Sequence, residues 1–86
     1  MDWKKYGYIV GSKYRQKIIL CINSKQKTPT QISQETNIPI THVSSILKDL
    51  LKKNIVRLLT PNVKKGKLFS LTKDGLEIAK ELKKVV

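Results

Sequence analysis

The sequence lacks the features that are typical of disulfide-crosslinked, secreted or membrane-spanning proteins. A single cysteine among 86 residues excludes an internal disulfide framework and suits a reducing cytosol. The longest unbroken apolar run covers only residues 18–22, and the N-terminus lacks the apolar stretch of about seven residues that a secretory signal needs. No internal repeat or low-complexity tract is present. We therefore expect a single cytoplasmic domain over residues 1–86, without a membrane span.

Acidic residues are also scarce. The chain has 18 lysines and arginines against 6 aspartates and glutamates, which gives a formal net charge of +12. Residues 1–30 and 61–86 carry most of this surplus. So large a charge repels itself within a small domain and lowers its stability unless a polyanion lies beside it. A solvated, lysine-rich surface is the alternative interpretation, and charge alone does not decide between the two.

Signatures of enzymes are missing. The sequence has no phosphate-binding glycine loop, no histidines or cysteines at metal-binding spacing and no paired carboxylates in an apolar setting. Cys21 falls on an apolar helical face, which favours a small core residue over a redox or metal role. His42 is the only histidine, and no second titratable group is placed to make it catalytic. We expect neither enzymatic activity nor a metal or cofactor.

The most informative segment is residues 28–56. A capping box formed by Thr28 and Gln31, with proline at the first helical position, predicts a short helix over residues 28–37. Asparagine at its end accepts a left-handed conformation, and a longer amphipathic helix over residues 39–53 follows after a tight turn. This is the layout of a helix-turn-helix, whose second helix can lie in the major groove of DNA.

The rest of the chain predicts what surrounds this pair of helices. Residues 12–24 have helical periodicity, and residues 73–86 form a second apolar stripe at the C-terminus. Between them, residues 55–72 alternate with a period of two around a basic turn, which is typical of a β-hairpin. Glycines interrupt residues 1–11, so we expect an extended or one-turn lead-in there. The fold class is mainly α with a β-hairpin: a winged helix-turn-helix with a three-helix core, a wing and a C-terminal helix.

Three stretches together resemble a known family: SKYRQKIILCI, TPTQISQETNIPITHVSSILKDLLKKNIV and GKLFSLTKDGLEIAKEL. They are similar to the small archaeal winged-helix transcription regulators, which are relatives of the ArsR and MarR groups. In such families the position of Asn54 is commonly glycine, and asparagine is a mild departure that suits the same backbone. The metal-sensing cysteine pairs of some ArsR proteins are absent. The resemblance therefore implies DNA binding without metal sensing.

Candidate DNA contacts follow from this layout. A recognition helix needs short polar side chains near its N-terminus, because they let the backbone approach the groove floor and reach base edges. The candidate base-reading residues are Thr41, His42, Ser44, Ser45 and Lys48. Helix N-termini and basic hairpins favour phosphates. The candidate backbone contacts are Thr28, Thr30, Gln31, Lys64, Lys65 and Lys67. Each group has an alternative role. The histidine would be a surface or capping group, and the residues at the helix start would serve only as helix caps. The hairpin lysines would serve only solubility.

Aromatic residues make up only 6% of the chain, and most of them crowd into its first fourteen residues. One small domain cannot easily bury all of these rings. We therefore expect a homodimer built from the N-terminal segment, the first helix and the last helix. The candidate interface residues are Trp3, Tyr6, Tyr8, Leu82 and Val85. The alternative is that the aromatic rings simply cover the core of a monomer.

These expectations combine into one function. The chain is predicted to be a sequence-specific regulator of transcription that binds double-stranded DNA, with the helix over 39–53 in the major groove. The basic wing would follow the backbone or enter the minor groove. No small-molecule substrate is evident. Two alternatives stay open: a nonspecific chromatin-type DNA binder, and a winged helix used for protein–protein assembly.

Overall fold

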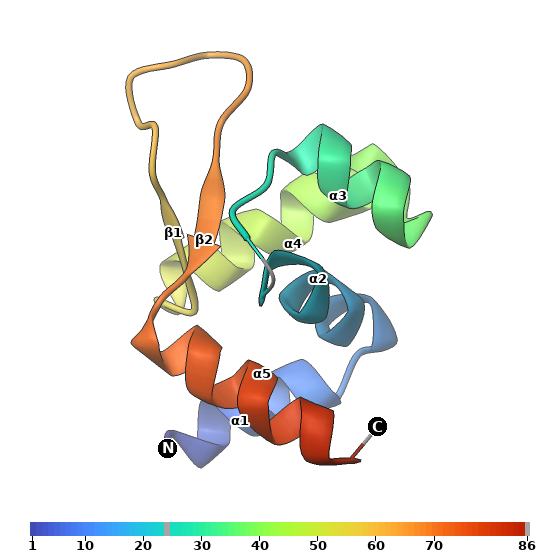
Figure 1. Ribbon diagram of the computed structural model, residues 1–86, viewed down its shortest axis with the longest axis vertical. Helices are drawn as coiled ribbons and strands as arrows, with labels where there is room; N and C mark the ends of the chain where they lie inside the picture. Colours follow the sequence, from blue (N-terminus) through green and yellow to red (C-terminus); the bar gives the residue numbers. More distant parts are fainter. Residues whose placement is uncertain (24, 86) are drawn as a thin grey trace.

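The computed structural model describes residues 1–23 and 25–85 of the chain. Within these ranges, five helices and a two-stranded antiparallel hairpin confirm the predicted fold class, with one helix more than expected (Figure 1). Their bounds are α1 Trp3–Val10, α2 Lys13–Asn23, α3 Pro29–Thr36, α4 Ile40–Lys52, β1 Val56–Leu58, β2 Phe69–Leu71 and α5 Lys73–Val85. Helices α1 and α5 lie at one end of the molecule, and the tip of the hairpin lies at the other (Figure 1).

The N-terminal segment is a helix, so the prediction of an extended or one-turn lead-in over residues 1–11 is wrong. Asp2 caps α1, and its carboxylate accepts hydrogen bonds from two backbone N–H groups of the first turn at 3.1 and 3.2 Å. Gly7 lies inside the helix, where glycine costs only about 1 kcal/mol relative to alanine. The burial of Ile9 in the core offsets this cost.

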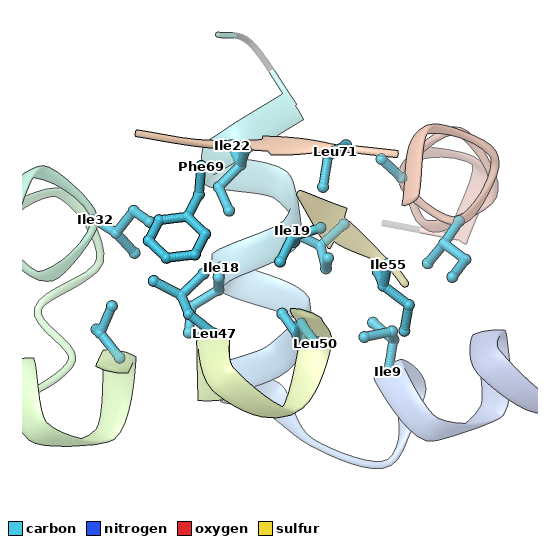
Figure 2. Packing of buried hydrophobic residues seen from close by; sticks show 14 of the residues in the cluster. Ile9, Ile18, Ile19, Ile22, Ile32, Leu47, Leu50, Ile55, Phe69 and Leu71 are labelled. Carbon is cyan, nitrogen blue, oxygen red and sulfur yellow. The ribbon is translucent and has the colours of Figure 1, made fainter. Parts of the chain in front are cut away.

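Helix α2 lies at the centre of the hydrophobic core. Its residues Ile18, Ile19 and Ile22 are buried, and the helix contacts α1, α3, α5 and β2 (Figure 2). Helix α4 contributes Leu47 and Leu50 to the same cluster (Figure 2). Full burial of each such side chain stabilises the fold by about 1.5–3 kcal/mol. One face of α4 is therefore packed in the core, and its other face is exposed to solvent.

The hairpin is built from two short strands and a long connection. Strands β1 and β2 pair with Val56 opposite Leu71. Beyond the strands, the Leu59 N–H still donates to the Leu68 carbonyl at 2.8 Å, which keeps the two arms together. Residues 59–68, which we call the wing loop, extend from this point away from the core (Figure 1).

A third short stretch of chain joins the hairpin. Lys27 and Phe69 form an isolated antiparallel bridge, with N–H to carbonyl distances of 3.1 and 2.9 Å. The Lys27 side chain is buried, and its Nζ lies 2.8 Å from Oε1 of Glu35. The hydrogen bond with Glu35 raises the pKa of Lys27, so this ammonium stays charged. The bridge and the ion pair therefore fasten the start of α3 to the hairpin.

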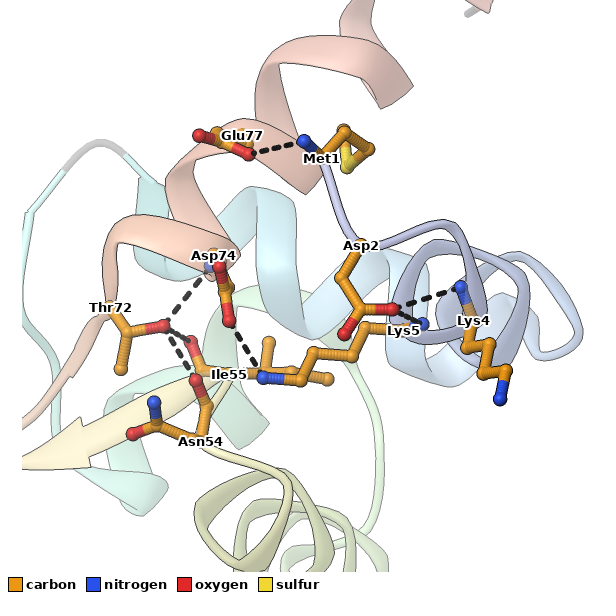
Figure 3. A network of polar contacts seen from close by, with 10 residues as sticks. Met1, Asp2, Lys4, Lys5, Asn54, Ile55, Thr72, Asp74 and Glu77 are labelled. Atoms are coloured by element: carbon orange, nitrogen blue, oxygen red, sulfur yellow. Dashed lines mark hydrogen bonds and ion pairs between the residues drawn. The ribbon is translucent and has the colours of Figure 1, made fainter.

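The start of α5 is packed closely against the end of the helix-turn-helix segment. The Thr72 hydroxyl lies within 2.8 Å of the Asn54 carbonyl and 3.0 Å of the Ile55 carbonyl, and it accepts from the Gly75 N–H at 3.1 Å (Figure 3). A Cβ on Gly75 would collide with the Ile55 carbonyl oxygen. Glycine is therefore needed here because two backbones approach each other, although its φ lies outside the left-handed region.

Two ion pairs join α1 to α5. The Lys5 ammonium lies 2.6 Å from the Asp74 carboxylate, and the N-terminal amine of Met1 lies 3.4 Å from Glu77 (Figure 3). The hydrogen bond from Lys5 lowers the pKa of Asp74 below that of an ordinary aspartate. The helix that sequence reasoning missed is thus attached to the last helix of the fold.

Candidate nucleic-acid interface

One face of α4 is exposed because the other is anchored in the core. Val43, Leu47 and Leu50 are buried and follow one another at helical spacing. The side chains between them therefore point outward. All five candidate base-reading residues are exposed: Thr41, His42, Ser44, Ser45 and Lys48. Leu51 is 40% exposed and lies at the edge of this face.

The turn between α3 and α4 sets the angle at which this face is presented. Asn37 adopts the left-handed conformation with φ of 61°, and its N–H donates to the Ser33 carbonyl at 2.9 Å. The Ser33 hydroxyl donates to the Ile38 carbonyl at 2.6 Å, and Ile38 itself is 1% exposed. The predicted stop at asparagine is confirmed, and the buried Ile38 fills the corner between the two helices.

The capping box at the start of α3 is also confirmed. The Thr28 hydroxyl accepts from the Gln31 N–H at 3.2 Å, and the Gln31 side chain accepts from the Thr28 N–H at 2.9 Å. These two side chains therefore hold the helix start in place. Thr30 is exposed beside them and makes no cap bond within the described part of the chain.

A groove joins the wing loop to the two helices of the helix-turn-helix. Its volume is about 420 Å³, and its lining comes from the start of α3, the start of α4 and the wing loop. The lining residues are Thr28, Pro29, Thr30, Ile40, Ser44, Lys64, Lys65, Gly66 and Lys67. Three lysines of the wing loop therefore share one concave surface with hydroxyl groups of both helices. A second hollow of about 250 Å³ adjoins it, and its lining includes Lys48 and Phe69.

Not every predicted contact lies in these hollows. Thr41, His42 and Ser45 are on the exposed face of α4 but line neither one. Gln31 is exposed on α3 and also lies outside both. The candidates thus form two adjoining sets, one beside the wing and one along α4. Ile40 was not predicted as a contact, because nothing in the sequence distinguishes it from an ordinary apolar residue. In the structure its side chain is 44% exposed and lies in the groove.

Tyr14 is a second residue that sequence reasoning missed. It lies in the first turn of α2, and its side chain is 41% exposed. Its ring meets the imidazole of His42 edge to face, with 5.8 Å between centroids and 66° between planes. No spacing rule relates the two positions, because the contact depends on how α2 and α4 cross.

The candidate dimer residues divide into three groups. Trp3 is 63% exposed and touches Tyr6 edge to face at 5.5 Å, whereas Tyr6 and Tyr8 are half-buried against the core. Leu82 is 2% exposed, so its assignment to an interface is corrected: the side chain is part of the monomer core. The side chain of Val85 lies outside the described part of the structure.

Tyr8 has a structural role that the sequence did not indicate. The Arg15 guanidinium lies 3.7 Å from the centre of its ring, and the Lys53 ammonium lies 4.5 Å from it. Arg15 also donates to the Tyr8 carbonyl at 2.9 Å. The ring therefore links α1 to α2 and to the C-terminal end of α4.

Residues 1–23 and 25–85 also bear on two other kinds of site, metal centres and membrane spans. Over these ranges no three histidine, cysteine or acidic side chains gather where a metal ion could be held. None of the helices there combines the length and apolar character needed to cross a membrane. Burial raises the pKa of the Cys21 thiol, which favours the unreactive thiol over the metal-binding thiolate.

The sequence of the chain matches a known protein family. The winged helix-turn-helix family profile matches residues 15–86, so the chain belongs to the winged helix-turn-helix family. No curated protein sequence matches the chain significantly.

Solved structures of regulators share the fold. Reduced MarR from E. coli has a TM-score of 0.75 and 25% identity, over 87% of this chain and 59% of MarR. ZitR from Lactococcus lactis, solved with DNA, has a TM-score of 0.74 and 22% identity, over 83% and 49% of the two chains. The homodimeric DNA-binding domain of Mb0332 from Mycobacterium bovis has a TM-score of 0.72 and 16% identity, over 96% and 73%. The chain thus spans about half of ZitR and three fifths of MarR.

Proposed function

We propose that this protein is a transcription regulator that binds double-stranded DNA and distinguishes among sequences. The observation that carries the proposal is the groove in which wing lysines and helix hydroxyls share one concave surface. Cations and hydroxyls are the groups that contact phosphate oxygens, and a groove between wing and helix suits a DNA backbone. The net charge of +12 supports a polyanionic partner.

In this proposal α4 lies in the major groove. Its exposed threonine and serines are short enough for the backbone to approach the base edges, and Lys48 reaches a base acceptor or a phosphate. Lys64, Lys65 and Lys67 contact the backbone or enter the minor groove beside it. The capped start of α3 presents its N-terminal dipole to another phosphate. The DNA present in the ZitR structure supports this use of the fold.

We also propose that the protein acts as a homodimer through α1 and α5. Trp3 and Leu76 are 63% and 51% exposed, so each helix presents a large apolar side chain that a partner could cover. They belong to the helices at the end of the molecule opposite the wing (Figure 1). A dimer formed there leaves both recognition helices free for half-sites about 34–36 Å apart. The homodimeric Mb0332 domain supports this assembly, and kinship with small archaeal regulators stays a prediction.

Selection of bound sequences from a random duplex pool, at a stated salt concentration, tests both proposals. A two-fold symmetric motif with a specificity ratio of at least about a thousand would support a dimeric regulator. Binding without enrichment would favour the chromatin-type alternative, which the high charge also permits. Absence of salt-sensitive binding would favour a protein assembly module. Sedimentation that gives a monomer at high micromolar concentration would overturn the dimer.

A further inference from the structure

We propose that Tyr14 is a positioning residue that fixes the orientation of His42 on the recognition helix. The inference rests on the proposed function, and it assigns a role to a residue outside the helix-turn-helix. It follows from the edge-to-face contact between the two rings, 5.8 Å apart and 66° between planes.

The position of Tyr14 is determined by the start of α2. The Ser12 hydroxyl accepts from the Arg15 N–H at 3.3 Å, which begins the helix and places Tyr14 in its first turn. One turn later Ile18 is fully buried, so the helix cannot rotate to bury the tyrosine as well. Tyr14 therefore stays 41% exposed at the rim of the core, where its ring meets α4.

His42 gains a defined orientation from this contact. It lies in the first turn of α4 and is exposed, so its imidazole would otherwise sample several rotamers. A side chain that is ordered before binding loses less conformational entropy when it contacts a base. An aromatic pair of this geometry contributes a factor of about 2 to 10 in an equilibrium. The expected effect is therefore on preference at the base pair that His42 reads, and affinity for unrelated sequences should change little.

A set of four variants tests this role: Tyr14→Phe, Tyr14→Ala, His42→Ala and the double alanine variant. Tyr14→Phe keeps the ring and should keep the wild-type base preference. Tyr14→Ala should relax preference at one position about 2- to 10-fold. The double variant should show at least as much base preference as His42→Ala, because the tyrosine acts through the histidine. Gln34→Ala is the matched control, since it also truncates an exposed helical side chain but lies on α3, outside both hollows.

A second readout needs no DNA. The ring protons of His42 in the NMR spectrum should shift in Tyr14→Ala and stay in place in Tyr14→Phe. Unchanged His42 signals in Tyr14→Ala would overturn the contact. This outcome is distinct from a failure of the proposed function. That failure would appear as a wild-type protein that selects no sequence from the duplex pool. If His42→Ala relaxes the motif while Tyr14→Ala does not, base reading survives and the positioning role is overturned.

Discussion

At the scale of single residues, Gly75 lies where the backbone at the start of α5 comes close to the Ile55 carbonyl. Thr72 contacts two carbonyls at the end of α4 and caps α5, so the helix start is held against the first strand of the hairpin. This packing gives a physical reason for the LTKDG stretch that follows the hairpin. Threonine supplies the hydroxyl, and glycine supplies the missing Cβ.

Substitution of this glycine should therefore destabilise the fold. We expect Gly75→Ala to lower the free energy of unfolding by about 1–3 kcal/mol, because its Cβ collides with the Ile55 carbonyl. Gly7→Ala is the matched control, since a Cβ there meets nothing within 4 Å and alanine favours helix. That variant should be more stable than wild type by about 0.5–1 kcal/mol. Denaturant unfolding measures both, and equal effects of the two substitutions would contradict the packing argument.

The ion pair between Lys5 and Asp74 should make stability depend on pH. The pKa of Asp74 is lower in the folded chain, so its contribution is present above the ordinary carboxyl pKa and is lost as pH falls through the folded value. Asp74→Asn should therefore be less stable than wild type at neutral pH, and this stability difference should shrink as pH falls through the folded pKa. Thermal unfolding across this range checks the sign. A stability difference that grows on acidification would refute the assignment.

At the scale of elements, the helix-turn-helix depends on asparagine rather than glycine. Asn37 and Asn54 both have positive φ, 61° and 59°, and each follows the end of a helix. A residue with a Cβ is strained in the left-handed conformation, and asparagine tolerates this conformation better than most other residues do. The orientation of α4 relative to α3 therefore depends on Asn37, although glycine would adopt this left-handed conformation with less strain.

Two substitutions at this turn should act in opposite directions. Asn37→Ala should cost about 1 kcal/mol, because alanine accepts the left-handed conformation poorly. Asn37→Gly should be at least as stable as wild type. Chemical denaturation with an unchanged m-value measures the difference. An alanine variant as stable as the glycine variant would show that this backbone conformation is not what limits the turn.

Much of this architecture was predictable because its signals are local. The capping box at Thr28, the stop at Asn37 and the apolar stripe of α4 depend on residues three or four apart. The helix at residues 3–10 was missed because Gly7 weakens the local signal while burial of Ile9 outweighs it. Contacts between distant elements, such as the pair formed by Tyr14 and His42, have no sequence spacing from which they could be inferred.

The buried position of Lys27 shows the same limit. Its neighbours in sequence are polar, and nothing local distinguishes it from the exposed lysines. Burial follows from its backbone bridge to Phe69 and from the ion pair with Glu35. Lysine is rarely buried without a partner, and both partners come from other elements. The wing groove was likewise predictable as a set of residues but not as a shared surface.

At the scale of the whole molecule, positive charge and polar discrimination lie on different elements. The candidate base-reading residues of α4 include one lysine, Lys48, among threonine, histidine and serines, whereas the wing loop holds Lys64, Lys65 and Lys67. Electrostatic affinity should therefore come mainly from the wing and the ends of the chain. Discrimination among sequences should come from α4. This division is the central claim of the proposed mechanism.

The salt dependence of DNA affinity tests that division most directly. If about six cations neutralise phosphates, the slope of log affinity against log salt should be roughly −5 for the wild type. Replacing Lys64, Lys65 and Lys67 together by glutamine should reduce it to between about −2 and −3. Ser45→Ala, the matched variant on α4, should keep the slope and lose preference among sequences. A wild-type slope near zero, or an unchanged slope in the triple variant, would contradict the account.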